Sequence, residues 1–253
     1  MKVLNFYSVK GGTGKSSLSL LSGKFLASKG KKTLILDLDP QRSISKSLGK
    51  SNEETTAYQW LLGDSSLKDT LQATTDENLY LLPGSLKLLK ISESVNQNFI
   101  QEEIETLNGF EYIIIDNQPS WNSIVRTGIQ ASHKVVIPSL LSLFDLEEVS
   151  FAIEETRKLK KEIEIGVILN RVLKVDKPTN EEKEYLEMFK DDFKGTLLSS
   201  MIPNSNLVRK SIDRQEDFLT GKTDTKKKFS KIVHSFLEEI TGEGFQPTLF
   251  GGN

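Results

Sequence analysis

The sequence predicts an α/β fold in which a doubly wound, mostly parallel sheet is flanked by helices on both faces. Short apolar runs rich in β-branched residues alternate with longer segments of helical pattern along the chain. Most of these short runs lack the regular change between apolar and polar residues that a half-exposed strand shows, which favours strands buried on both faces. Such a sheet binds ligands at the carboxyl ends of its strands.

The expected elements follow one another from the N-terminus. Strands are predicted at Val3–Ser8, Thr33–Asp37, Asn78–Leu82, Tyr112–Asp116, Lys134–Ile137, Ile163–Leu169 and Thr196–Ser199. Helices are predicted at 15–29, 42–49, 55–62, 86–108, 121–131, 146–161, 179–192, 207–217 and 225–241. The last helix has the clearest pattern, because Phe229, Val233 and Phe236 recur at the spacing of one helical face.

Length and composition narrow the class of protein. The 253 residues suit one large domain, which we expect to cover 1–241, followed by a flexible tail at 242–253. The absence of cysteine excludes disulfides, thiolate metal sites and a cysteine nucleophile. A net charge of -2 means that any nucleic-acid site must be a local basic patch. The first apolar run is too short for a signal peptide and no run approaches the roughly 20 residues of a membrane span, so we expect a cytoplasmic protein.

A glycine-rich segment connects the first predicted strand to the first predicted helix. It reads Val9-Lys10-Gly11-Gly12-Thr13-Gly14-Lys15-Ser16. Glycines let the backbone turn so that successive N–H groups and the helix N-terminus converge on phosphate oxygens. Lys15 would add a cation and Ser16 a hydroxyl ligand for Mg²⁺. The segment therefore predicts a nucleotide phosphate site, with an ordinary glycine-rich turn as the alternative.

The segment departs from the general phosphate-loop pattern at Val9, where that pattern has glycine. The form KGGTGKS resembles the deviant Walker A motif of the ParA/MinD family of ATPases. The resemblance implies a deviant P-loop NTPase that binds ATP and Mg²⁺ through Gly11, Gly12, Thr13, Gly14, Lys15, Ser16 and Ser17. It also implies that Lys10, the signature lysine, reaches across an ATP-bridged homodimer to the phosphates of the other subunit, so that Lys10 and Lys15 both serve catalysis.

The second motif of the resemblance is an acidic pair at the end of a buried strand. The segment Leu34-Ile35-Leu36-Asp37-Leu38-Asp39-Pro40-Gln41 carries it. By position in the family motif, Asp39 would orient the water that attacks the γ-phosphate, and Asp37 would belong to the metal shell. Either carboxylate could instead cap the helix that follows.

A third motif has the form of a Walker B strand, in which the carboxylate of Asp116 faces Mg²⁺. On its own the signal is weak, because a strand-end aspartate is often a cap or a turn residue. The family continues with Asp-x-Pro-Pro, whereas Gln118 stands here in place of the first proline. We therefore expect Ser16, Asp37 and Asp116 around the metal, and a loop after Asp116 whose shape differs from that of the family.

Two later residues complete the resemblance. Asn170 corresponds to the family asparagine that reads the polar edge of adenine, and Pro203 lies in a segment whose backbone packs against the base. An asparagine at a strand end can equally be a cap.

The sequence of the C-terminal third helps to choose between the functions that proteins of this fold perform. The absence of cysteine removes the iron–sulfur branch of the family. The stretch from Ser205 to His234 holds eight basic and four acidic residues, a net +4 in a chain of -2, which suits a binder of the phosphate backbone. We expect Arg209, Lys210, Arg214, Lys227 and Lys231 to bind double-stranded DNA without sequence preference. Solvated surface charges are the alternative.

These observations favour a DNA-partition ATPase. The resemblance to ParA implies an ATP-bridged dimer that binds DNA over the nucleoid, and a ParB-like centromere-binding or adaptor protein that triggers hydrolysis and release. A MinD-like ATPase on a membrane is one alternative, but residues 243–252 contain no Lys or Arg and are interrupted by Pro247, so no membrane contact is expected. An ATP-dependent biosynthetic ligase is a second alternative, and it leaves the basic stretch without a role.

Overall fold

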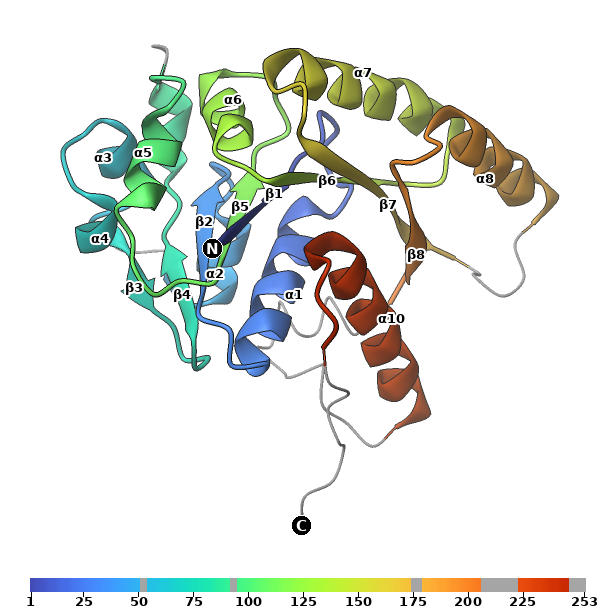
Figure 1. The fold of residues 1–253 in the computed structure, drawn as a ribbon, viewed down its shortest axis with the longest axis horizontal. Helices are drawn as coiled ribbons and strands as arrows, with labels where there is room; N and C mark the ends of the chain where they lie inside the picture. The colour runs from blue at the N-terminus through green and yellow to red at the C-terminus, as the bar shows by residue number, and fades with distance from the viewer. Residues whose placement is uncertain (51–53, 92–94, 174–178, 206–222, 246–253) are drawn as a thin grey trace.

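One mostly parallel sheet runs through the part of the protein that the computed structural model describes, residues 1–50, 54–91, 95–173, 179–205 and 223–245 (Figure 1). Its eight strands lie in the order β3-β4-β2-β5-β1-β6-β7-β8. Their bounds are β1 Lys2–Phe6, β2 Thr33–Leu38, β3 Gln72–Ala73, β4 Leu79–Leu82, β5 Tyr112–Asn117, β6 Lys134–Ser139, β7 Glu164–Val172 and β8 Leu197–Pro203. All neighbours are parallel except β3, which is antiparallel to β4. The predicted fold class is confirmed.

The central strands are buried on both faces, as their continuous apolar sequences predict. In β1, Leu4 and Phe6 belong to the core on one face and Val3 to the core on the other. Every residue of β2 and of β5 is buried. Parallel strands read as unbroken apolar runs for this reason, because crossover helices cover both faces.

The helices form a layer on each face of the sheet (Figure 1). Their bounds are α1 Lys15–Ser28, α2 Ser43–Ser47, α3 Ala57–Leu61, α4 Leu67–Thr70, the 3-10 helix η1 Leu86–Lys90, α5 Phe99–Glu105, α6 Ser123–Gln130, α7 Leu143–Leu159, α8 Asn180–Asp192 and α10 Asp224–Thr241. Helices α1, α2 and α10 share one core with the sheet. Helices α3 to α8 pack on the opposite face in two further clusters.

The structure corrects the helix expected over 86–108. It has two separate helices there, η1 and α5, because polar residues divert the backbone between them. Asn96 accepts a hydrogen bond from the backbone N–H of Asn98, and the hydroxyl of Thr127 on α6 donates to the carbonyl groups of Asn96 and Gln97. Such side-chain bonds compete with helix formation. The short elements α4 and β3 were not predicted, and the helix expected at 207–217 lies outside the described residues.

The chain after α10 begins packed against the domain. Gly242 ends the helix in the left-handed conformation, and Phe245 is buried against the rings of Phe25 and His234. Residues 246–253 lie outside the described part. Across the described ranges, none of the helices combines the length and the apolar character needed to span a membrane.

Strand order departs in opposite directions on the two sides of β1, toward β5 and β2 on one side and toward β6, β7 and β8 on the other. A crevice forms outside the carboxyl ends of the strands at such a point. The glycine-rich segment leaves β1 at this end of the sheet, so the topology places the predicted phosphate site at the crevice.

Candidate active site

The loop between β1 and α1 forms the floor of the candidate site. Gly12 and Gly14 have φ angles of 80° and 99°, in the left-handed region that favours glycine. A Cβ atom at Gly14 would lie 2.1 Å from Nδ2 of Asn170, so any larger residue would displace that side chain from the loop. Helix α1 begins at Lys15 without a side-chain cap and without an acidic residue in its first turn. Its first N–H groups and its dipole are therefore available to an anion.

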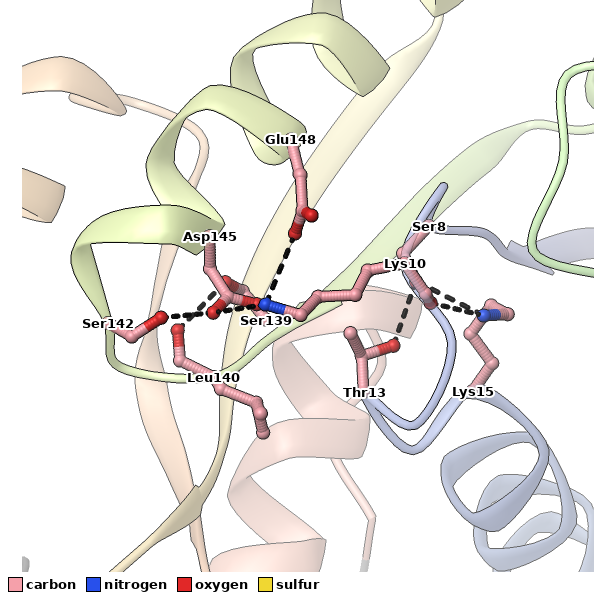
Figure 2. A network of polar contacts seen from close by, with 9 residues as sticks. All are labelled: Ser8, Lys10, Thr13, Lys15, Ser139, Leu140, Ser142, Asp145 and Glu148. Atoms are coloured by element: carbon pink, nitrogen blue, oxygen red, sulfur yellow. Dashed lines mark hydrogen bonds and ion pairs between the residues drawn. The ribbon is translucent and has the colours of Figure 1, made fainter.

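Hydrogen bonds between residues of the loop stabilise its conformation (Figure 2). The Ser8 hydroxyl lies 2.8 Å from that of Thr13 and donates to the carbonyl of Lys10 at 3.0 Å. The ammonium of Lys15 donates to the same carbonyl at 3.0 Å and to the Ser8 hydroxyl at 3.2 Å. Burial lowers the pKa of Lys15, while the charges of Asp116 and Asp39 oppose that shift. Thr13 is thus buried beneath the loop and supports its shape.

A cavity of about 870 Å³ lies above the loop, a volume in the range of small-molecule sites. Gly11, Gly12, Gly14, Lys15, Ser16 and Ser17 line one side of it, as the sequence predicts. Asp39, Asn170 and Pro203 line it as well. The fold therefore brings most of the predicted nucleotide contacts, which are far apart in sequence, to one cavity.

Two carboxylates lie fully buried beneath this cavity, on neighbouring strands. Asp37 of β2 and Asp116 of β5 stand directly opposite each other in the sheet register. Asp37 accepts two hydrogen bonds from Ser45, at 2.6 Å from its hydroxyl and 2.9 Å from its backbone N–H, and Asp116 accepts one from Ser19 at 2.9 Å. The second oxygen of each carboxylate, Oδ1 of Asp37 and Oδ2 of Asp116, has no hydrogen-bond partner.

Burial makes it unfavourable for Asp37 and Asp116 to carry a negative charge. It raises the pKa of Asp37 to about 6, against the lowering effect of the Ser45 hydrogen bonds. Burial and then the charge of Asp37 raise the pKa of Asp116 well above its ordinary value. A buried anion that lacks a full set of hydrogen-bond partners is stabilised by a nearby cation. A cation bound beside Asp37 and Asp116 would therefore stabilise their charged forms.

The Asp37→Asn variant is expected to be more stable than the parent protein at pH 8 in the absence of nucleotide and Mg²⁺. A carboxyl whose pKa is raised by folding stabilises the protein below its unfolded pKa of 3.8, and this contribution is lost as the pH rises through about 6. Asparagine keeps an acceptor for Ser45 and removes the charge, so the gain should be about 2 to 3 kcal/mol at pH 8 and small at pH 4.

Urea denaturation of the two proteins at both pH values measures this difference. Asp64→Asn, a matched change at an exposed aspartate, should leave stability unchanged at both pH values. Equal stability of the parent protein and Asp37→Asn at pH 8 would show that the buried carboxylate carries no such cost.

Asp39 occupies a different environment from the buried pair. It follows β2, lies on the cavity wall and is 7% exposed. One carboxylate oxygen accepts a hydrogen bond from the backbone N–H of Gln41 at 2.8 Å, which fixes the turn after the strand. Asp39 is therefore held in a fixed position on the cavity wall.

Lys10 does not point into the cavity. Its ammonium lies 3.0 Å from Asp145 and 3.5 Å from Glu148, both on the first turns of α7 (Figure 2). Asp145 is buried, and it also accepts from the hydroxyl of Ser142, so the lysine is held by an anchored carboxylate. Sequence patterns carry no signal for this contact, because Lys10 is 135 positions from Asp145 and no motif joins it to the two carboxylates.

Asn170 is tied to the phosphate loop. Its Nδ2 donates to the carbonyl of Thr13 at 2.7 Å, and its Oδ1 accepts from the backbone N–H of Arg171 at 2.9 Å. Together with the close approach to Gly14, these bonds fix the end of β7 against the loop. Contact of Asn170 with a base stays a prediction, and it would use the remaining hydrogen-bonding capacity of the amide.

The structure describes two of the five basic residues that were predicted to bind DNA. Lys227 and Lys231 are exposed, one turn apart, on the side of α10 opposite its buried apolar residues. Arg209, Lys210 and Arg214 lie outside the described residues.

Comparison with known proteins agrees with this geometry. The family model of an AAA domain matches residues 1–175. The sporulation initiation inhibitor protein Soj of Bacillus subtilis is 29% identical over 214 residues, which are 81% of this chain and 85% of Soj. The chromosome partitioning protein ParA of Caulobacter vibrioides is 29% identical over 184 residues, which are 67% of this chain and 69% of ParA.

Solved structures share the fold. A plasmid partition protein of Borrelia burgdorferi bound to AMPPNP superposes with a TM-score of 0.80 at 24% identity, covering 94% of this chain and 99% of that one. A Cyanothece McdA variant in complex with ATP superposes with a TM-score of 0.85 at 20% identity, covering 98% and 99%.

The sheet topology and the phosphate loop define a nucleotide-hydrolysing enzyme of the P-loop class. The chain belongs to the AAA domain family and, within it, to the ParA/MinD partition ATPases.

Proposed function

We propose that this ATPase binds ATP and Mg²⁺ at the cavity above the phosphate loop and uses the bound state to hold DNA during partition of a plasmid, a chromosome or another large cargo. The proposal is carried by the phosphate loop: an uncapped helix N-terminus and a buried Lys15 line one cavity, and two buried carboxylates, Asp37 and Asp116, lie behind Ser16 of its lining. The first two features bind phosphate oxygens, and the third favours a divalent cation.

The residues present fit Mg²⁺. Orphaned carboxylate oxygens on Asp37 and Asp116 supply the oxygen chemistry that this ion prefers, and the Ser16 hydroxyl, which contacts Asp116, adds a third oxygen. Mg²⁺ usually takes one or two carboxylates and completes its shell with water and substrate phosphates. The ion would neutralise the phosphates during hydrolysis. Asp39 would orient the attacking water from the cavity wall.

Lys10 would couple nucleotide binding to assembly. In the single chain its ammonium is neutralised by Asp145 and Glu148. In a homodimer bridged by ATP, it would leave these carboxylates and reach the phosphates bound by the other subunit. The Lys10 ammonium would exchange carboxylate partners for phosphate partners, so the free-energy cost of moving it would be low. The negative charge of ATP could therefore drive this movement.

The dimer would bind double-stranded DNA through the lysines of α10, with Arg209, Lys210 and Arg214 extending the surface. Contacts to backbone phosphates carry no sequence information, which suits movement over the nucleoid. Dimerisation doubles the number of contacts, so DNA affinity would depend on ATP. A ParB-like centromere-binding or adaptor protein carried by the cargo would stimulate hydrolysis and so reset the dimer.

Charge reversal at Lys227 and Lys231 tests the DNA surface. The double variant Lys227→Glu, Lys231→Glu is expected to lose at least about tenfold in affinity for arbitrary double-stranded DNA in the presence of ATP, because each lost phosphate contact removes counterion release. Its ATP turnover without DNA should match that of the parent protein. Fluorescence anisotropy with a labelled duplex measures the affinity.

The matched control carries the same change in charge on the opposite face of the sheet. Lys161 follows α7 and Lys183 lies on α8, and both are exposed. The double variant Lys161→Glu, Lys183→Glu should bind DNA nearly as well as the parent protein. Equal affinities of the two double variants would place the DNA surface elsewhere.

A further inference from the structure

Gln118 stands where the Walker B motif of the family continues with its first proline. The residue follows directly after β5, is 9% exposed and lines the cavity above the phosphate loop. Within the described residues, its side-chain amide makes no hydrogen bond. A nearly buried amide without partners is unfavourable for folding, and each such group calls for an explanation. A ligand in the cavity would supply the missing partners.

The pairing of β2 with β5 places Gln118 beside Asp39. The last pair in the register of these two strands is Leu38 with Asn117. Asp39 and Gln118 each follow that pair by one residue, and neighbouring strands lie about 4.8 Å apart. Both residues line the cavity. The carboxyl edge of the sheet therefore brings a carboxylate and an amide from two different strands to the wall of the candidate nucleotide site.

The backbone on both sides of Gln118 is anchored to the β1 segment. Before it, Nδ2 of Asn117 donates to Oδ1 of Asn5 at 2.7 Å. After it, the ring of Trp121 packs against that of Tyr7, with 5.6 Å between the ring centroids. A side chain on a fixed backbone can orient a reactant with little loss of freedom, which suits a catalytic role.

We propose that Gln118 is a further catalytic residue, whose side-chain amide holds the water that attacks the γ-phosphate together with the carboxylate of Asp39. The inference rests on the proposed function, because it requires ATP in this cavity and Asp39 beside the attacking water. The side chain of proline has neither a donor nor an acceptor, so the role belongs to this chain and not to the family motif.

Two acceptors are needed to orient a water molecule for this attack. When its O–H bonds donate to Asp39 and to Oε1 of Gln118, a lone pair is left to face phosphorus. Nε2 of Gln118 can then donate to a γ-phosphate oxygen. The water oxygen bonds to phosphorus while the bond from phosphorus to the bridging oxygen breaks, and ADP leaves with that electron pair. One proton of the water passes to a phosphate oxygen, which completes inorganic phosphate.

The test separates the chemical step from the binding of ATP. Gln118→Ala should lower kcat about tenfold, the size of one or two net hydrogen bonds, and change the KM for ATP by less than about twofold. Calorimetry in Mg²⁺ then compares a non-hydrolysable ATP analogue with ADP and aluminium fluoride, which together mimic the phosphoryl group during transfer. The variant should bind the second complex about tenfold more weakly and the first like the parent protein, because the contact strengthens only in the transition state.

Two further variants serve as controls. Gln118→Met keeps the length of the side chain and removes both polar groups, so it should show the same selective loss. It keeps the test valid if Gln118→Ala folds poorly. Gln101→Ala removes an exposed glutamine of α5 and should hydrolyse ATP like the parent protein.

The outcomes distinguish this inference from the proposed function. Unchanged kcat in Gln118→Ala and Gln118→Met would overturn the inference. An equal loss of affinity for both nucleotide complexes would do the same, because it would indicate a ground-state contact or a distorted cavity. A parent protein that does not bind the ATP analogue, or an Asp39→Ala protein with normal turnover, would instead overturn the proposed site itself.

Discussion

Replacement of Asp39 with alanine is expected to slow ATP turnover by at least about 100-fold while ATP still binds, because a group that positions or activates the attacking nucleophile contributes on this scale. The carboxylate lies on the cavity wall, fixed by its bond to the Gln41 N–H. The phosphate contacts come from the loop and from Lys15, which the substitution leaves in place. Phosphate release and binding of a fluorescent ATP analogue, measured on the same samples, separate the two effects.

Asp39→Asn is the matched variant for this experiment. Alanine removes the acceptor for Gln41 and with it about 1 kcal/mol of local stability, whereas asparagine keeps the acceptor and removes only the charge. Slow turnover in both variants would assign the effect to the carboxylate. Normal turnover in either would remove Asp39 from the role proposed for it.

Replacement of Lys10 with alanine is expected to weaken ATP-dependent dimerisation by at least about 30-fold, since loss of one partner from a buried charge pair costs 2 kcal/mol or more. Binding of ATP by the single chain should persist, because the loop network depends on the Lys10 backbone carbonyl and not on its side chain. Sedimentation velocity with a non-hydrolysable ATP analogue measures the dimer.

The contacts that Lys10 makes with Asp145 and Glu148 in the single chain provide a control for this experiment. Glu148→Gln removes one of the two carboxylates that hold the lysine in the single chain, and Glu148 is partly exposed and 3.5 Å away. This variant should dimerise with ATP at least as readily as the parent protein. A Lys10→Ala protein that dimerises normally would contradict a role of the lysine between subunits.

Local patterns were sufficient to predict the long parallel strands, the helices that connect most of them and the phosphate loop, but not the short elements α4 and β3. Continuous apolar runs predicted β2 and β5 as buried parallel strands. The spacing of Gly12, Gly14 and Lys15 after β1 predicted a turn that only glycine can make and a helix N-terminus that follows at once.

Features that arise from contacts between distant residues were not predictable in this way. The break between η1 and α5 depends on Thr127, whose hydroxyl donates to backbone carbonyl groups 31 and 30 residues before it. The ion pair of Lys10 with Asp145 depends on how α7 packs beside the loop. The place of Gln118 beside Asp39 depends on the register between β2 and β5, which no periodicity in either strand reveals.

Nucleotide state should control the affinity of the protein for DNA, and binding of the purified protein to an arbitrary duplex tests this dependence most directly. We would measure affinity with ATP, with ADP and without nucleotide, at about 50 mM and about 200 mM salt, a span over which several phosphate contacts change affinity many-fold. We expect tight binding with ATP only, and we expect salt to weaken it steeply. Equal binding in all three nucleotide states, or no binding in any of them, would contradict it.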